Sequence, residues 1–414
     1  MDLQRTNYAS GAPKEATLGY SRVVKTGPFI EVGGTTSVQP DGSVYAENDT
    51  YGQIKYVLEK QIKLVEEAGG KLEDIYKLKI FCTPQYNAED GIKALKEVLK
   101  GSAPVCTITQ IYSLVRPPQV VEIELSACIG SAIGMEWEGI SMKQKKIPFE
   151  GKELPYSAAI KIGPFIYVSG MAVEDSDILD KTQSDSDLQD DEIYKKEMKI
   201  VESLGGTAAD VIKIDSTAVT EYKHHRNIQE STYYKEYFKP VKPLHTMVYV
   251  PGTEKEKQLV QHEIYAIEGC GGKEQLASWG NIDFRRMNIS SGSPLEEKAG
   301  YSRIVKTGPF VYCGGTTSVL PDGTVDREED SLGQESFVIE KFMKLLEPLQ
   351  VKPEEVVQCR AYRTPDYKKY NKGIDGTYAK ILKPVRPLYT GLFIKELTRP
   401  AQLVEFEMTA VLGC

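Results

Sequence analysis

The chain has 414 residues, with 51 Lys and Arg against 59 Asp and Glu and a formal net charge of −8. A net negative charge argues against a nucleic-acid groove or an anionic membrane surface as the main partner. No apolar run approaches the length of a membrane span, and the first residues lack the apolar core of a signal peptide. We therefore expect a cytoplasmic protein, and the odd count of seven cysteines without CxxC spacing indicates reduced thiols.

One segment of the chain occurs three times. Residues 19–38 read GYSRVVKTGPFIEVGGTTSV, and residues 300–319 read GYSRIVKTGPFVYCGGTTSV. A weaker copy, YSAAIKIGPFIYVSGM, covers residues 156–171. The repeat is the size of a domain and much longer than the unit of a solenoid. The sequence therefore predicts three tandem domains, the middle one divergent, joined by linkers that contain glycine and charged residues. Their expected ranges are 1–132, 148–272 and 284–414.

Within the first copy the elements follow in a clear order. A Gly-Pro between two β-rich runs predicts a hairpin, and an amphipathic apolar pattern that stops at Gly69-Gly70 predicts a helix. A strand, a second helix and two final strands complete the order ββαβαββ, which the other copies are expected to share. After the hairpin, the expected segments are 51–70, 71–83, 88–101, 105–115 and 119–129.

These segments resemble the Rid proteins, also called YjgF/YER057c/UK114. The resemblance rests on the Tyr-Ser start, the Gly-Pro-Phe turn, the AGG or LGG after the first helix and the Val-Glu-Ile-Glu last strand. It implies α+β domains similar to chorismate mutase, which in the family assemble as trimers around a central β-barrel with one ligand site at each subunit interface. We therefore expect a monomeric pseudo-trimer with a pseudo-threefold axis, whose further self-association stays open. No cofactor is implied.

The resemblance also implies positions for the chemistry. Catalytic family members hydrolyse small imines or enamines, using an arginine that grips the substrate carboxylate and a glutamate that positions the attacking water. The glutamate position holds Glu122, Gln261 and Glu405. The arginine position holds Cys106, His245 and Tyr389. Because no copy keeps the arginine, ordinary imino-acid hydrolysis lacks its carboxylate anchor.

The hairpins supply the remaining candidate residues. The resemblance places a tyrosine ring and a glycine amide beside the ligand. The threonine that follows the glycine puts a hydroxyl next to it as a donor to a polar ligand, and an arginine two residues after the tyrosine shares its strand face. In the first copy these residues are Tyr20, Arg22, Gly34 and Thr35, and in the third they are Tyr301, Arg303, Gly315 and Thr316. The second copy has Ala158 and Met171 in place of the arginine and the threonine. We therefore expect function in the pockets built by the first and third copies.

Cysteine and histidine suggest two further sites, neither of which is favoured. Cys106 lacks a histidine partner in its own copy, so a buried structural thiol is preferred over a nucleophile. His245 and His262 lie on adjoining final strands, but strand alternation leaves open that His262 faces away. No metal site is expected.

The favoured hypothesis is a Rid-like hydrolase for a small polar nitrogen compound, an imine, enamine or amide, with Glu122 or Glu405 holding water. One alternative is a ring-opening cyclic amide hydrolase like barbiturase or cyanuric acid hydrolase, which also contain three related domains but use serine–lysine pairs. Ser21 and Lys25 are the pair that this alternative would use in the first copy. The other alternative is a non-catalytic metabolite-binding protein.

Overall fold

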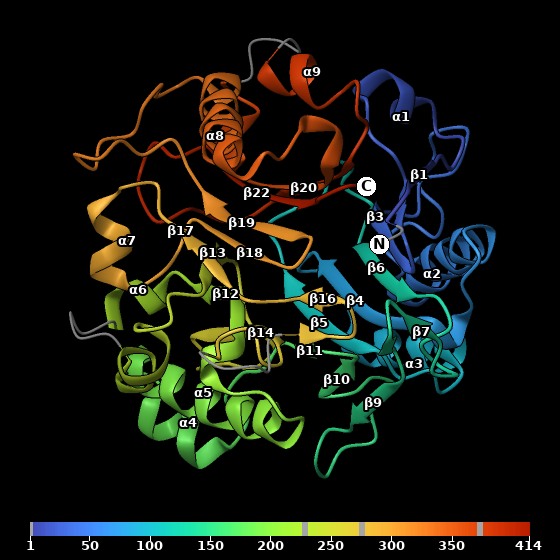
Figure 1. Ribbon diagram of the computed structural model, residues 1–414, viewed down its shortest axis with the longest axis horizontal. Helices are drawn as coiled ribbons and strands as arrows, with labels where there is room; N and C mark the ends of the chain where they lie inside the picture. The colour runs from blue at the N-terminus through green and yellow to red at the C-terminus, as the bar shows by residue number, and fades with distance from the viewer. Residues whose placement is uncertain (1–2, 226–230, 273–277, 371–375) are drawn as a thin grey trace.

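Figure 1 presents a computed structural model of the chain, in which residues 3–225, 231–272, 278–370 and 376–414 are described. Three six-stranded sheets follow one another along the chain, each with its own helices. The sheets gather around the middle of the molecule in Figure 1, and the long helices α2 (Thr50–Glu67), α5 (Ser186–Ser203) and α8 (Ser331–Leu346) lie toward the outside. These mixed sheets with helices are consistent with the Rid fold.

The first sheet has the order β1-β2-β3-β6-β4-β5. Its strands are β1 (Arg5–Tyr8), β2 (Val23–Thr26), β3 (Phe29–Thr35), β4 (Ile75–Cys82), β5 (Val105–Gln110) and β6 (Val121–Cys128), and its other helices are α1 (Pro13–Leu18) and α3 (Ala88–Leu99). The β2–β3 hairpin turns at Gly27, whose φ of 55° is adopted by glycine without steric cost. Asp49 caps α2 by accepting a hydrogen bond from the Gly52 amide.

The second sheet has the order β13-β12-β14-β11-β10-β9, which is the same connectivity read from the other edge. Its strands are β9 (Gln144–Ile147), β10 (Ala159–Ile162), β11 (Phe165–Val168), β12 (Val211–Val219), β13 (Leu244–Val250) and β14 (Val260–Ile267). Besides α5, it carries α4 (Ser176–Thr182), α6 (Glu221–His225) and a π-helical segment over Tyr234–Phe238.

The third sheet repeats the first, with the order β17-β18-β19-β22-β20-β21. Its strands are β17 (Met287–Ile289), β18 (Ile304–Thr307), β19 (Phe310–Thr316), β20 (Val356–Arg363), β21 (Leu388–Phe393) and β22 (Val404–Val411), and its other helices are α7 (Pro294–Ala299) and α9 (Thr377–Ile381). Short 3-10 turns cover Leu72–Asp74, Ala208–Asp210, Glu347–Leu349, Pro353–Glu355 and Pro365–Tyr367. The sequence did not predict the strands β1, β9 and β17, each of which pairs with the first strand of a hairpin.

The segments expected to be linkers contain short hairpins in the parts that the structure describes. One contains the hairpin β7 (Glu136–Trp137) and β8 (Ile140–Ser141), and the other contains β15 (Ser278–Trp279) and β16 (Ile282–Asp283). The ring of Trp137 packs edge-on against Phe29, with 5.2 Å between centroids. Both segments therefore add to the core instead of only joining domains.

Each sheet buries one face against its own helices and the other against the neighbouring sheets. In the first sheet, Ile54 and Leu58 of α2 pack with Ile80 and Ile123 of the strands, all fully buried. In the middle, Phe29, Phe165 and Phe310 take equivalent places on β3, β11 and β19 and meet edge to face with centroids 5.4–5.6 Å apart. The three units therefore share one apolar centre.

The sheets are hydrogen-bonded separately, so the described residues form no closed barrel of the kind that the resemblance implies. Isolated bridges join their edges instead, between Ser21 and Leu388 and between Val105 and Ser157. Two-residue contacts of this kind do not extend into a continuous ladder. No helix in the described part of the chain is long and apolar enough to cross a membrane.

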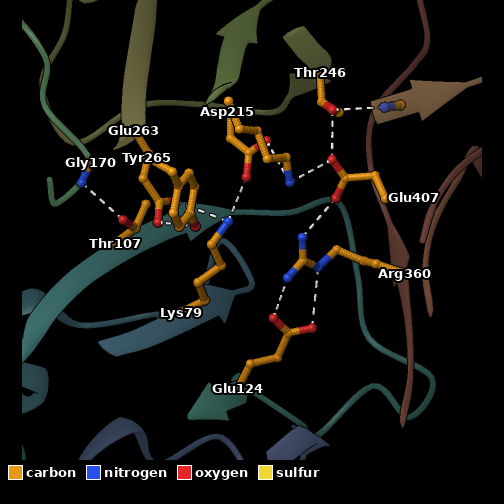
Figure 2. A network of polar contacts seen from close by, with 12 residues as sticks. Lys79, Thr107, Glu124, Gly170, Asp215, Thr246, Glu263, Tyr265, Arg360 and Glu407 are labelled. Atoms are coloured by element: carbon orange, nitrogen blue, oxygen red, sulfur yellow. Dashed lines mark hydrogen bonds and ion pairs between the residues drawn. The ribbon is translucent and has the colours of Figure 1, made fainter. Parts of the chain in front are cut away.

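A buried network of charged side chains links the three units (Figure 2). Lys79, Asp215 and Arg360 hold equivalent positions, since each pairs in register with a glutamate of the last strand of its sheet. Lys79 Nζ lies 2.8 Å from Asp215 Oδ2 and 3.1 Å from Glu263 Oε2. Burial lowers the pKa of Arg360, but the charge of Glu124, to which it is hydrogen-bonded, holds the pKa well above its ordinary value. In a homotrimer the same residue would stand at this position in every subunit, so the pairing of Lys79 with Asp215 is possible only because the units are not identical.

Candidate functional site: the pockets between the sheets

Each hairpin lies beside the penultimate strand of the preceding unit, and the first hairpin lies beside that strand of the third unit. Backbone hydrogen bonds define this pairing. The amides of Ser21, Ser157 and Ser302 donate to the carbonyls of Pro387, Pro104 and Pro243, over 3.1, 2.8 and 3.2 Å. The residues at the family's arginine position therefore meet the hairpin of a different unit.

The interface between the second and third units holds a cavity of about 270 Å³. The third unit contributes Tyr301, Arg303, Gly315 and Glu405 to its lining, and β13 of the second unit contributes His245. Five of the predicted site residues thus meet at one pocket, although they lie on two different units.

Arg303 is held in place by four contacts in the wall of this cavity. Its Nε lies 3.0 Å from Glu296 Oε1, its Nη1 donates to Gly315 O at 2.8 Å and Thr316 Oγ1 at 2.9 Å, and its Nη2 donates to Tyr301 OH at 3.2 Å. The side chain is buried, as is Glu296. Such a paired guanidinium positions the tyrosine and the glycine loop, and it places a fixed positive charge at the cavity surface.

Arg22 repeats this arrangement in the first unit. Its Nε lies 3.0 Å from Glu15 Oε1, its Nη2 donates to Tyr20 OH at 3.2 Å, and its Nη1 donates to Gly34 O and Thr35 Oγ1. The sequence predicted the arginines but missed their acidic partners, which come from α1 and α7. Two glutamates at matching places, in KEATLGYSR and LEEKAGYSR, are the signal that could have identified them.

The glycine amides and threonine hydroxyls expected to bind substrate have partners within the protein. The Gly315 amide donates to Thr246 Oγ1 at 2.9 Å, and Thr316 Oγ1 donates to Gly314 O at 2.9 Å. In the first unit, the Gly34 amide likewise donates to Thr390 Oγ1 at 3.0 Å. An amide has one proton to donate, so these groups orient the loop across the interface.

The absence of a side chain at Gly315 lets Glu405 approach the loop. A Cβ there would collide with Glu405 Oε1 and lie 2.7 Å from Thr246 Cγ2. Burial raises the pKa of Glu405 to about 8, with a further increase from Glu407 that the charge of Arg303 opposes. Burial raises the pKa of the equivalent Glu122 to about 7 against the charge of Arg22. Both carboxyls therefore titrate in the range that suits acid–base catalysis near neutral pH.

At the interface between the third and first units, aromatic side chains of the third unit cross toward Tyr20. The Tyr378 hydroxyl donates to Gly19 O at 3.1 Å. The Tyr389 ring lies 5.0 Å from the Tyr378 ring, and its hydroxyl bonds to Arg363. Tyr20 therefore meets tyrosines of the third unit at this interface.

At the interface between the first and second units, a cavity of about 280 Å³ is lined by Cys106, Tyr156, Gly170 and Gln261. Cys106 is 3% exposed, and burial raises the pKa of its thiol far above the ordinary value. A thiol that stays protonated is a poor nucleophile, which agrees with a structural cysteine. With glutamine in place of the glutamate, this pocket lacks the candidate acid–base group.

Sequence reasoning missed one cation in the pocket between the second and third units. Lys341 of α8 lines the cavity, and burial followed by the charge of Arg303 lowers its pKa to about 8. Arg399 also lines it. Lys60 stands at the same helix position in the first copy, and this repetition is the signal that could have identified Lys341.

His245 and His262 do come together. Ser216 Oγ lies 2.9 Å from His245 Nε2 and 2.8 Å from His262 Nδ1, so the rings share one hydroxyl. Asp190 Oδ1 lies 2.9 Å from His262 Nε2. Within the part of the chain that the structure describes, no group of three or more His, Cys, Asp or Glu could hold a metal ion.

Three β-rich units with cavities at their shared edges define a class of α+β proteins built from repeated units. The sequence profile of the family described as endoribonuclease L-PSP matches residues 10–129. A RutC family protein of Pyrococcus abyssi is 32% identical over 108 residues, which cover 26% of this chain and 83% of that protein. An uncharacterized protein of Streptomyces coelicolor is 26% identical over 122 residues, which cover 30% of this chain and 90% of that protein.

The chain is also similar in part to solved structures. A YjgF/YER057c/UK114 member from Mycobacterium tuberculosis is 27% identical, with a TM-score of 0.27 over 30% of this chain and 100% of that chain. Yeast Mmf1 is 20% identical, with a TM-score of 0.28 over 30% of this chain and 99% of that chain. The chain belongs to the Rid (YjgF/YER057c/UK114) superfamily.

Proposed function

We propose that the chain is a single-chain pseudo-trimer of three Rid domains at residues 1–132, 148–272 and 284–414. The equal strand order of the three sheets supports this arrangement, as do the equivalent phenylalanines at the centre. The opposite charges of Lys79 and Asp215 at one repeated position favour assembly within a single chain.

We propose further that the pocket between the second and third domains is a hydrolytic site for a small polar nitrogen compound, with imines derived from amino acids as the leading class. The observation that carries this proposal is Glu405, a buried carboxyl with a pKa raised to about 8 that faces a cavity of about 270 Å³. Membership of the Rid family supports a small-molecule function of this kind. Glu405 would hold the attacking water and exchange a proton with it, while Tyr301 would line the substrate.

The positive charges that line this pocket favour a substrate that carries a carboxylate. The family's carboxylate-gripping arginine is replaced by His245, but Lys341 and Arg399 line the same cavity. A cation that lines a cavity binds a carboxylate strongly, because little water is present to screen the two charges. We assign the carboxylate-binding role to these two side chains.

The contacts of the serine–lysine pairs do not favour a cyclic amide hydrolase. In the first copy, Lys25 Nζ donates to Ala68 O at 3.1 Å. At the equivalent places of the second copy, Ser157 Oγ donates to Ala103 O at 2.8 Å, while Lys161 Nζ donates to Leu204 O at 2.7 Å and pairs with Glu268. A serine nucleophile needs its base within hydrogen-bond reach, and these two side chains have other partners.

Ammonia release tests the proposal directly. Imines are generated from amino acids by an amino-acid oxidase, and ammonia is measured with and without the protein. Glu405→Gln should lower the rate by about 10²-fold, the typical contribution of one acid–base group. Glu122→Gln is the matched control, because it makes the same substitution at the interface filled by tyrosines and should keep most of the activity.

Two outcomes would overturn the proposal. Full activity of Glu405→Gln would show that this carboxyl does not hold the water. Melting that depends on added imino or amino acids, with no ammonia released by any form, would instead identify a metabolite-binding protein.

A further inference from the structure

A row of four polar side chains runs through the second domain to the proposed reaction pocket. Asp190 Oδ1 lies 2.9 Å from His262 Nε2, and His262 Nδ1 lies 2.8 Å from Ser216 Oγ. Ser216 Oγ in turn lies 2.9 Å from His245 Nε2. His262 is 0% exposed and Ser216 is 2% exposed, whereas the two ends of the row, Asp190 and the half-buried His245, both line the cavity.

When both imidazoles are neutral, the hydrogen bonds of this row can run in only one direction. The ionised Asp190 only accepts, so His262 carries its proton on Nε2 and accepts at Nδ1. Ser216 therefore donates its single proton to His262, and the remaining contact requires that His245 Nε2 donates to Ser216 Oγ. Nδ1 of His245 is then the basic nitrogen of the ring.

Aromatic rings hold both imidazoles in place. Tyr194 stacks on His262 with centroids 4.4 Å apart and 9° between the planes, and the Tyr222 hydroxyl donates to Asp190 Oδ2 at 2.8 Å. Tyr234 stacks on His245 at 5.4 Å, and its hydroxyl donates across the interface to Gly300 O at 3.1 Å. The row is therefore fixed at both ends.

The fold itself does not require these polar residues. Ser216 pairs in register with His262, as Ile80 pairs with Ile123 in the first domain, where both side chains are fully buried. Burying polar groups costs free energy unless every one is hydrogen-bonded, so an apolar set is the simpler solution. In the first domain, isoleucines stand at the places of Ser216 and His262. The polar row of the second domain also ends in a cavity, and these two observations point to a function.

We propose that Asp190, His262 and Ser216 form a proton relay that makes His245 a second acid–base group of the pocket that contains Glu405. This inference rests on the proposed function. Nδ1 of His245 takes a proton from water as the water oxygen bonds to the carbon of the protonated imine, and the electron pair of the C=N bond moves onto the nitrogen, which becomes a neutral amine. The proton on Nε2 passes to Ser216 Oγ, and the Ser216 proton passes to His262 Nδ1.

The relay balances its protons and charges. One proton enters at His245, which ends neutral with Nδ1 protonated, and one proton is gained by His262, which becomes an imidazolium beside the Asp190 carboxylate. The positive charge is thus stored next to a negative one and against the face of Tyr194, where cations are favoured. The reverse sequence returns the proton to the amine nitrogen. Ammonia then leaves with the electron pair of the C–N bond, while the hydroxyl oxygen forms the carbonyl and gives its proton to water.

Nitrogen-15 NMR of the histidine side chains tests the relay without any substrate. Two-bond correlations at neutral pH should show both His245 and His262 with the proton on Nε2. In Ser216→Ala, His245 should lose its fixed tautomer and populate both forms, while His262 should keep Nε2–H because Asp190 is unchanged. The chain has four histidines in all, and His224→Gln identifies a signal outside the row and should leave the others as they are.

Two NMR results would overturn the relay. One is a proton on Nδ1 of His245 in the unsubstituted protein. The other is an unchanged His245 tautomer in folded Ser216→Ala, with folding checked by its melting curve. Both results test the direction of the hydrogen bonds without any substrate. A failure of the relay can therefore be distinguished from a failure of the proposed imine hydrolysis.

If imines are hydrolysed, the kinetics add a second test. Ser216 is buried, and the inferred role is in proton transfer alone, so Ser216→Ala should lower kcat by about 10²-fold with little change in KM. A purely structural role would change KM or the melting temperature instead. An unchanged kcat in Ser216→Ala would refute the relay.

Discussion

Replacing Glu405 by glutamine should stabilise the fold at alkaline pH. Burial raises the pKa of Glu405 from its ordinary value of 4.5 to about 8. Each pKa unit corresponds to about 1.4 kcal/mol, so ionising this buried carboxyl costs the folded state about 5 kcal/mol. Glutamine has nearly the same shape and never ionises. Glu405→Gln should therefore remove this cost and leave the packing unchanged.

The sign follows from where each state holds its proton. Below pH 4.5 the carboxyl is protonated in both states, and the two proteins should have similar free energies of unfolding. Between pH 4.5 and 8 the unfolded chain has lost the proton while the folded protein keeps it, so the unsubstituted protein loses stability as pH rises. Above pH 8 the difference should level off at about 5 kcal/mol.

Urea unfolding at intervals from pH 4 to 9 measures this difference. The same substitution at Glu122, whose pKa is raised to about 7, should give a smaller gain of about 3 kcal/mol. Glu59→Gln, at an exposed position on α2, is the control and should show no pH-dependent gain. A difference between Glu405→Gln and the unsubstituted protein that stays constant from pH 4 to 9 would refute the reasoning.

Three further substitutions test the packing around the pockets. Lys79→Met leaves Glu263 without the lysine 3.1 Å away, whereas Asp215 keeps Lys213 at 3.0 Å, and it should lower the free energy of unfolding by about 3 to 5 kcal/mol, measured by urea unfolding; a loss below 1 kcal/mol would contradict a buried ion pair. Gly315→Ala should abolish ammonia release because its Cβ takes the space of the neighbouring carboxylate, whereas Gly33→Ala, with its nearest neighbour at 3.5 Å, should keep it; equal activities would argue against this geometry. Trp137→Ala should cost about 3 to 5 kcal/mol in the same unfolding assay, and a neutral effect would show that the β7–β8 hairpin is not part of the core.

Much of the fold could be predicted from local patterns. The order ββαβαββ of the first copy follows from apolar periodicity, glycine stops and the Gly-Pro turn, and the strands and helices form where these signals lie. The edge strands β1, β9 and β17 could not be predicted, because each has only three or four residues, too few for a periodic pattern, and is specified only by pairing with a hairpin.

Part of the candidate site was also predictable. Tyr301, Arg303 and Glu405 were identified because the hairpin recurs almost letter for letter and the last strand keeps its glutamate, and they do line one cavity. Lys341 was missed because a lysine on an amphipathic helix normally faces solvent, whereas the fold partly buries this one near Arg303 and Glu296.

The sequence by itself determined the repeat, the elements of each unit and the residues of each hairpin, because these depend on neighbours in the chain. Only the tertiary structure decided that His245 meets the third hairpin while Tyr389 meets the first. It also decided that His262 points toward Ser216. Such contacts join residues far apart in the chain, where local periodicity carries no information and packing between sheets sets the partners.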